Sequence, residues 1–197
     1  MKNFIPRILM LVLLIAAVST CTTRKVQRVS ANTQIDLSGR WNSTDAQQTA
    51  DAMIGQALGE RWLPEFTQQS QGKRPVVIVG FVKNNTSEHI DSEVFLKDLE
   101  KSFINSGRVR LVQGGQQREE IRAERADQQN FSSQVTMKKW GREVGADFML
   151  QGTMSSITDA YKKEKVIYYQ IDLTLTNLET NEVVWIGDKK IKKYITN

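Results

Sequence analysis

Cys21 is the only cysteine in the chain, and a cysteine thiolate can form a covalent bond to a lipid. It stands three positions after an apolar run, Ile8–Val18, which is preceded by the basic residues Lys2 and Arg7. A membrane-spanning helix needs about 20 apolar residues, whereas the apolar part of a secretory signal needs only about 7 to 15. The run therefore predicts a signal peptide over residues 1–20 that is removed on export.

Cys21 resembles the lipidated cysteine of bacterial lipoproteins, whose signals end directly before a cysteine that takes diacylglycerol on its thiolate. Such signals usually have Gly, Ala or Ser before the cysteine, and this chain has Thr20. We therefore predict lipid attachment at Cys21. The alternatives are secretion with a free thiol and an uncleaved anchor, and the apolar run is too short for the second. Thr22 stands where an aspartate would favour inner-membrane retention in enterobacterial sorting, so we expect anchoring in the outer membrane, with the domain facing the periplasm.

Other candidates for catalysis are few. His89 is the single histidine and lies in a polar stretch beside Glu88 and Asp91, which is typical of an exposed loop histidine rather than a base. Gly114 and Gly115 lack the spacing of a phosphate-binding loop. The sequence predicts no catalytic residue, no cofactor and no metal site. The enzymatic alternative, a periplasmic hydrolase, would depend on His89 or on one acidic residue.

The charge distribution bears on the partners of the protein, and the cysteine count bears on its stability. The formal net charge is +5, and loss of Lys2 and Arg7 with the signal leaves +3. Basic and acidic residues are interleaved, so we expect no nucleic-acid partner. The basic runs Lys162–Lys165 and Lys189–Lys193 are interpreted as solvated lysines at strand edges. One cysteine allows no disulfide, so the mature domain must be stable through packing alone.

The chain divides into three predicted parts: the signal over 1–20, a lipidated N-terminus with a short tether over 21–36, and one globular domain over 37–197. Thr22–Gln34 is polar and shows no sustained periodicity, as expected of a tether. Fully extended, it spans roughly 45 Å, and as a coil nearer 20 Å. The domain is therefore expected to stay close to its membrane.

In the first half of the domain, helical periodicity predicts a helix that begins at Ser43–Asp45, continues to Trp62 and ends near Pro64. A short strand is predicted before it, at Ser38–Trp41. The valine-rich run Pro75–Val82 predicts a central strand that is buried on both faces. A second helix is predicted over Ser92–Ser106, followed by a left-handed cap at Gly107.

The second half begins with a predicted strand at Val109–Val112. A helix over Gln116–Gln129 follows, with charge at almost every position, so it must be solvated or covered by a partner. A short helix over Thr136–Val144, capped by Gly145, and a strand over Asp147–Met154 complete this part.

From Tyr168 the residues alternate between apolar and polar, and a turn at Leu178–Asn181 leads to Val183–Ile186, a strand whose continuation is expected as far as Ile195. Together these elements predict an α/β fold: a two-layer domain with a mixed β-sheet of about four strands, flanked by helices and ending in an antiparallel hairpin. The four tryptophans, Trp41, Trp62, Trp140 and Trp185, are expected to pack against this sheet.

Three ordered segments resemble the LpoB family: Pro75–Gly80 with the following Lys83–Thr86, the block Glu143–Gly152, and the closing hairpin Leu173–Trp185. The resemblance covers roughly residues 37–193. It implies a compact α/β domain with about four strands, on an outer-membrane lipoprotein that stimulates a class A penicillin-binding protein, the synthase that polymerises and crosslinks peptidoglycan. Such a protein is a regulator and not an enzyme.

One feature departs from the family pattern, because the best-known enterobacterial member has a long proline-rich tether and this tether is short and without proline. A different partner is therefore kept open. The alternative function is a lipoprotein subunit of an outer-membrane secretion or envelope-assembly complex. On the charged helix, Arg122 with Arg125 is one exposed pair whose charge reversal could abolish partner capture, although a plain solvated helix is the simpler interpretation.

Overall fold

The computed structural model describes residues 26–30, 33–131 and 143–196. The predicted signal peptide and Cys21 lie outside these residues, as does most of the predicted helix over Thr136–Val144. The chain divides into two compact units, Met1–Thr33 and Gln34–Asn197. In the first unit, the described residues Val26–Ser30 are exposed and without regular structure. The second unit contains the sheet and the helices.

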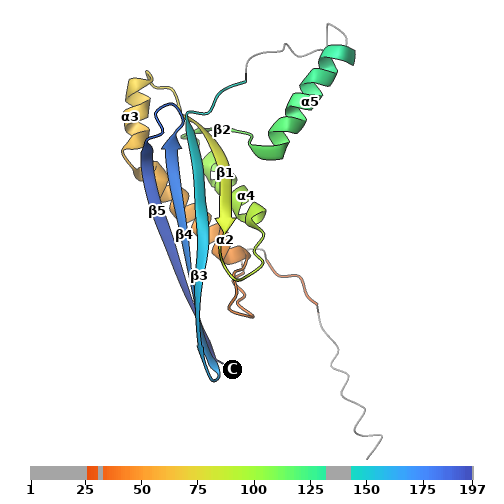
Figure 1. Ribbon diagram of the computed structural model, residues 1–197, viewed down its shortest axis with the longest axis vertical. Coiled ribbons are helices and arrows are strands. Elements are labelled where there is room, and N and C mark those ends of the chain that lie inside the picture. The colour runs from red at the N-terminus through yellow and green to blue at the C-terminus, as the bar shows by residue number, and fades with distance from the viewer. Residues whose placement is uncertain (1–25, 31–32, 132–142, 197) are drawn as a thin grey trace, which may run out of the picture. The chain divides into compact units, whose positions relative to one another are not determined.

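The described residues form one sheet with strand order β2-β1-β3-β4-β5 (Figure 1). Its strands are β1 (Val76–Asn84), β2 (Arg110–Val112), β3 (Phe148–Tyr161), β4 (Glu164–Asn177) and β5 (Val183–Thr196). β1 pairs in parallel with β2 and β3, whereas β3, β4 and β5 form an antiparallel meander. The predicted mixed α/β fold is therefore confirmed, and the described sheet has five strands where about four were expected.

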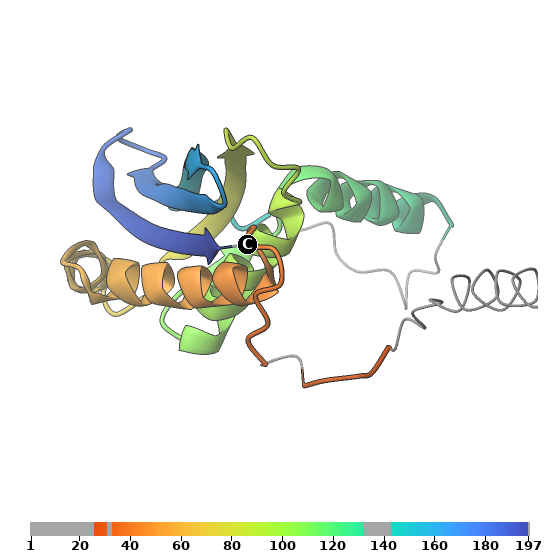
Figure 2. The same cartoon turned by 90° about the horizontal axis from the view of Figure 1, so that it is seen from below.

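Four helices lie in the described residues: α2 (Ser43–Gly59), α3 (Trp62–Gln69), α4 (Ser92–Ser106) and α5 (Gly115–Phe131). Figure 2 shows α2 and α4 side by side on one face of the sheet, where α2 contacts β5 and α4 contacts β1. The predicted bounds of α4 are confirmed, and so is its left-handed cap at Gly107, whose φ is 63°. α5 also forms where charge and periodicity predicted a helix.

The core lies between the sheet and α2 and α4. Along β4, every second side chain is buried against the helices, in keeping with the predicted alternation. β1 is buried from Val76 to Val79 and at Val82, as expected of a strand with neighbours on both sides. The prediction of burial along the whole run is wrong at Phe81, which is 61% exposed. Each fully buried large apolar side chain contributes about 1.5–3 kcal/mol. Fully buried members of this core include Met53, Phe95, Leu99, Phe103, Tyr169, Ile171, Leu173 and Leu175.

Two predictions for the first helix and its approach are wrong. Ser38–Trp41 is not a strand, because Gly39 takes a left-handed φ of 66° and the Trp41 N–H bonds to side chains instead of a neighbouring strand. The helix ends at Gly59, and Pro64 lies in the first turn of α3, where a proline is tolerated because its missing N–H has no helical partner.

The meander is longer than predicted. β3 continues to Tyr161 and β4 starts at Glu164, so the turn at Lys162–Lys163 joins two strands of 14 residues each. The predicted strand of the alternating region began only at Tyr168, because the residues before it are polar and charged. The predicted run of the last strand to Ile195 is confirmed. Glu143 and Val144, which were expected to end a helix, are not helical.

Gly152 allows β3 and β4 to approach closely. A Cβ atom at this position would overlap the carbonyl oxygen of Asp172 and lie 2.5 Å from a methyl carbon of Leu173. Real Cβ atoms do not approach backbone so closely, so a side chain here would force the two strands apart. The helix-facing layer of the sheet therefore depends on a glycine at this position.

Candidate functional site

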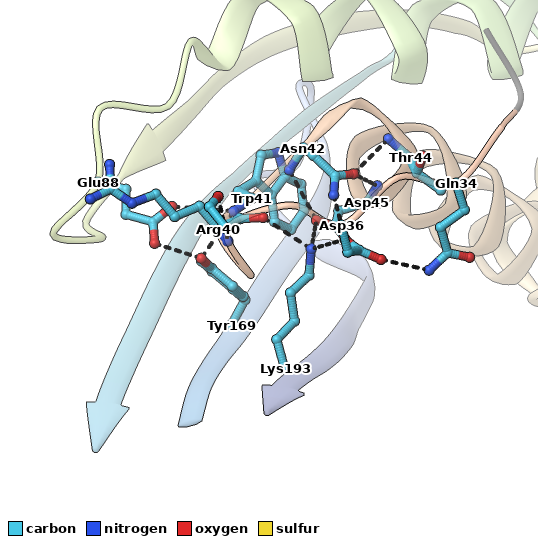
Figure 3. Close-up of polar contacts among 11 residues, drawn as sticks. Gln34, Asp36, Arg40, Trp41, Asn42, Thr44, Asp45, Glu88, Tyr169 and Lys193 are labelled. Atoms are coloured by element: carbon cyan, nitrogen blue, oxygen red, sulfur yellow. Dashed lines mark hydrogen bonds and ion pairs between the residues drawn. The ribbon is translucent and has the colours of Figure 1, made fainter. Parts of the chain in front are cut away.

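Lys193 of β5 joins the segment before α2 to the sheet (Figure 3). Its Nζ donates to Asp36 Oδ1 at 2.9 Å, to the carbonyl oxygen of Arg40 at 3.0 Å and to Asp45 Oδ2 at 2.5 Å. An ammonium group has three protons, and this arrangement uses all of them. Lys193 and Asp45 side chains are only 11% and 12% exposed, so this contact is shielded from water. We call Asp36, Arg40, Asp45 and Lys193 the lysine clamp.

The helix cap of α2 belongs to the same network. Asn42 Oδ1 accepts the backbone N–H groups of Thr44 and Asp45, and Asp45 Oδ2 accepts the N–H of Asn42, which completes a capping box. Asn42 Nδ2 also donates to Asp36 Oδ1 at 2.6 Å. The start of α2 and the segment before it are therefore held by one connected set of bonds.

The pKa values of Asp36 and Lys193 favour the charged forms of these two side chains. A hydrogen bond from Gln34 and then one from Lys193 lower the pKa of Asp36 from 3.8 to about 2. Burial by itself would lower the pKa of Lys193, but its bonds to Asp45 and Asp36 raise the pKa above the ordinary value of 10.5. The Asp36–Lys193 ion pair is therefore formed throughout the neutral range.

A second link runs from Tyr169 of β4 to the loop after β1. The Tyr169 hydroxyl donates to Glu88 Oε1 at 2.6 Å and accepts the Trp41 N–H at 3.0 Å. Burial, followed by the bond to Glu88, raises the pKa of Tyr169 above its usual range. The Trp41 ring packs edge-on against Tyr169 and Phe95. Segment 34–42 is thus held over the helix-facing side of the meander by both links.

These polar groups bond to one another, so the arrangement holds the fold and leaves no free base or nucleophile within it. His89, the candidate base, is exposed in its loop and contributes no bond to the cluster. Asp91 caps α4 through Glu93 N–H. Within the described residues, no group of three or more His, Cys, Asp or Glu side chains could hold a metal ion.

The opposite face of the meander presents a different surface. Side chains there alternate with the buried ones, and register places Ile157 beside Tyr168 and Val166 beside Tyr194. Ile157, Tyr161 and Tyr194 are 68%, 70% and 62% exposed. We call this surface the tyrosine patch; its members are Ile157, Tyr161, Val166, Tyr168 and Tyr194. Neighbouring exposed apolar and aromatic side chains of this kind are typical of protein-binding surfaces.

The other residues singled out from the sequence lie at several places in the fold. Gly114 packs against Ile78 and precedes α5, and Gly115 is its first residue. Arg122 and Arg125 lie on α5 and both contact Glu143. Trp62 and Trp185 are buried and Trp41 is half-buried, which confirms their packing role; Trp140 lies outside the described residues. Lys162 and Lys163 of the β3–β4 turn and Lys190 and Lys192 of β5 are exposed, as expected of solvated lysines. The interpretation is wrong for Lys193, whose side chain is only 11% exposed.

The lysine clamp, the Tyr169–Glu88 bond and the tyrosine patch were not predicted from the sequence. Lys193 was interpreted as one of several solvated lysines, and nothing in its local sequence distinguishes it from Lys192. A signal for the patch was present, because Tyr168 and Tyr194 stand at polar positions of the strand alternation. Such large aromatic side chains on a solvated face indicate a binding surface.

In the described residues, then, polar groups bond one another around the start of α2, while apolar and aromatic side chains stay exposed on the other face of the sheet. Exposed clusters of this kind are typical of the class of domains that bind other proteins. No helix among these residues has the length and apolarity to cross a membrane. The model of the family described as peptidoglycan-synthase activator LpoB matches residues 45–191, and the chain belongs to this family. It is a family of regulators and not of enzymes.

Solved structures of low sequence identity resemble the chain. The LpoB C-terminal domain from Salmonella enterica is 19% identical, with a TM-score of 0.44, over 75% of this chain and 98% of that one. The LpoB C-terminal domain from Escherichia coli is 18% identical, with a TM-score of 0.45, over 78% and 99%. Lipoprotein GNA1162 from Neisseria meningitidis is 12% identical, with a TM-score of 0.40, over 62% and 84%. No curated protein matches the sequence.

Proposed function

We propose that this protein is a lipoprotein of the outer membrane, anchored through diacylglycerol on Cys21, and that its periplasmic domain binds and activates a class A penicillin-binding protein. Membership of the synthase-activator family is the observation that carries this proposal. The apolar run before Cys21 supports export and anchoring. In this function the protein performs no chemistry itself.

Activation requires that the domain bind one state of the synthase more tightly than another, because a ligand shifts an equilibrium only by its difference in affinity. The tyrosine patch is the surface that we assign to this contact. Tyr161, Tyr168 and Tyr194 offer large aromatic area with few rotatable bonds, and such residues supply much of the binding energy at interfaces. The neighbouring Lys190 and Lys192 are exposed on the same face and form its polar rim.

The tether limits where the contact takes place. The clamp holds Asp36 against β5, so the free chain between Cys21 and the domain is short. At about 3.3–3.6 Å per residue, the segment Thr22–Gln34 spans roughly 45 Å when fully extended. The domain therefore stays near its own membrane, and the bound part of an inner-membrane synthase has to extend toward it.

A crosslinking pull-down of the lipidated protein from its native envelope tests the proposal, with partners identified by mass spectrometry. We expect recovery of a class A penicillin-binding protein, and faster glycan polymerisation by that purified enzyme when the domain is added. Recovery of outer-membrane secretion or assembly components alone would contradict the proposal and favour the alternative of a scaffold subunit. A Cys21→Ser variant that still fractionates with the outer membrane would contradict the anchor.

The double variant Tyr168→Ser with Tyr194→Ser tests the assigned surface. Both side chains lie on the face away from the core, so the variant is expected to fold and to lose stimulation. Thr174→Ser with Thr176→Ser, further along the same face of β4, is the matched control. If the tyrosine variant stimulates the synthase as well as the wild type does, the patch is not the contact.

A further inference from the structure

Three arginines and three acidic residues lie on opposite sides of α5. Three arginines, Arg118, Arg122 and Arg125, follow a spacing of four and three residues, which places them on one side of a helix. Three acidic residues, Glu120, Glu124 and Asp127, repeat the same spacing two positions later. Because each residue turns the helix by about 100°, these acids lie on the opposite side. We call the first set the arginine stripe.

A carboxylate from outside α5 already occupies the arginine stripe. Glu143 accepts two parallel bonds from Arg122, Nε to Oε1 at 2.9 Å and Nη2 to Oε2 at 3.0 Å. Arg125 Nη1 lies 3.7 Å from the same Oε1. Paired bonds of this kind are the geometry in which a guanidinium recognises a carboxylate. The hydrogen bond from Arg122 also lowers the pKa of Glu143.

The stripe holds more positive charge than its contacts neutralise. Among the described residues, Arg122 also bonds Glu119. Arg118 donates to the carbonyl oxygen of Gln113, and Arg125 shares Glu143 with Arg122. The side chains of Arg122 and Arg125 are 47% and 46% exposed, so a second molecule can reach both. Further carboxylates therefore have guanidinium groups to bind.

An apolar hollow of about 200 Å³ adjoins these arginines. Its apolar lining comes from Val112, Ile121 and Val144, and Ile121 and Val144 are themselves exposed. A hollow of this size takes a single apolar side chain. A polypeptide can supply that side chain between two acidic ones, whereas a phosphate or a bare carboxylate cannot.

We propose that the arginine stripe and its hollow bind an acidic segment of a partner protein, with two or more carboxylates beside one apolar side chain, and that Glu143 competes for the same site. Where the partner is the synthase, this inference rests on the proposed function and adds a second contact to the tyrosine patch. The competition gives the surface a distinctive property: removal of Glu143 strengthens binding.

The test uses the full-length protein and a short fluorescent helical peptide with three glutamates one turn apart and one leucine beside them. We expect Glu143→Gln to tighten binding about 3-fold and Arg122→Gln with Arg125→Gln to weaken it about 10-fold, with both effects decreasing as salt increases. Glu120→Gln is the matched control, because it changes net charge as Glu143→Gln does but lies on the opposite face of α5.

Equal effects of Glu120→Gln and Glu143→Gln would overturn the inference, because only non-specific charge would be acting. Unchanged binding by the double arginine variant, with an unchanged thermal midpoint, would overturn it as well. Binding of isolated peptidoglycan, lost in the double variant while the peptide never binds, would overturn it in favour of cell-wall carboxylates.

The same variants separate this inference from the proposed function. If the synthase binds the wild type and the double arginine variant equally, the stripe is not a contact and the proposed function stands. If no synthase is captured but the peptide follows the expected order, the stripe is an acidic-segment site and the proposed function fails.

Discussion

Lys193 Nζ lies 2.5 Å from Asp45 Oδ2, although 148 positions separate the two residues. The contact joins the last strand of the sheet to the first turn of α2. Through Asp36 and the Arg40 carbonyl, the same ammonium group also holds the segment by which the domain is connected to the proposed tether. Lys193 thus connects the start of the domain to its last strand, alongside the second link through Tyr169 and Glu88.

Lys193→Met is expected to lower the free energy of unfolding by about 3 kcal/mol, because it leaves Asp45 partly buried without its cation. Urea unfolding of the two proteins measures the difference. Lys192→Met, one residue earlier and exposed on the other face, is the control and is expected to change stability by less than about 0.5 kcal/mol. Equal losses in both variants would show that Lys193 has no special role.

The clamp also makes stability depend on pH at both extremes. The pKa of Asp36 is lowered to about 2 in the folded protein, so its contribution is present above the unfolded value of 3.8 and is lost as pH falls from there toward 2. The pKa of Lys193 is raised, so its contribution is complete below 10.5 and is lost above that pH. Asp36→Asn is expected to destabilise the protein at pH 6 and to approach the wild type near pH 2. If the difference in unfolding free energy between Asp36→Asn and the wild type is the same at pH 6 and near pH 2, this dependence on pH is contradicted.

Gly152→Ala is expected to destabilise the domain by about 2 kcal/mol or more, because the new methyl group would meet the Asp172 backbone. Gly55→Ala is the opposite case. Gly55 lies on α2, where the methyl group of an alanine would have no packing neighbour within 4 Å, and alanine there is expected to add about 0.5–1 kcal/mol. Thermal unfolding followed by circular dichroism compares them, and a stable Gly152→Ala variant would show that the strands separate easily.

Tyr169→Phe removes a hydroxyl that serves Glu88 and the Trp41 N–H. We expect a loss of about 1–3 kcal/mol, since two polar groups lose a partner in a half-buried place. The control is Tyr168→Phe. The Tyr168 hydroxyl donates to Gln170 on the open face, so its removal is expected to be nearly neutral. Urea unfolding of each variant and of the wild type measures the two differences. If Tyr169→Phe is as stable as the wild type, water replaces the Tyr169 hydroxyl.

Much of the fold could be predicted from the sequence, because its signals are local. α4 has an apolar face, an Asp91 cap and a glycine stop within 17 residues, and its bounds agree with the prediction. The valine run of β1 and the alternation of β4 are equally self-contained. The approach to α2 was predicted less well, because its conformation depends on bonds to Glu88 and Tyr169, which are distant in the chain.

The sequence was sufficient for the helical and strand periodicities, the mixed α/β class, the resemblance to the activator family and the prediction of a lipidated Cys21, because each depends on neighbouring residues or on ordered segments. The tertiary structure was needed to distinguish Lys193 in the clamp from the solvated Lys192, and to bring Glu143 to Arg122. The clamp of Lys193 and the Glu143–Arg122 pair are both contacts between residues that are distant in the sequence. A charged side chain acquires its partner, its burial and its pKa only when the chain has folded around it.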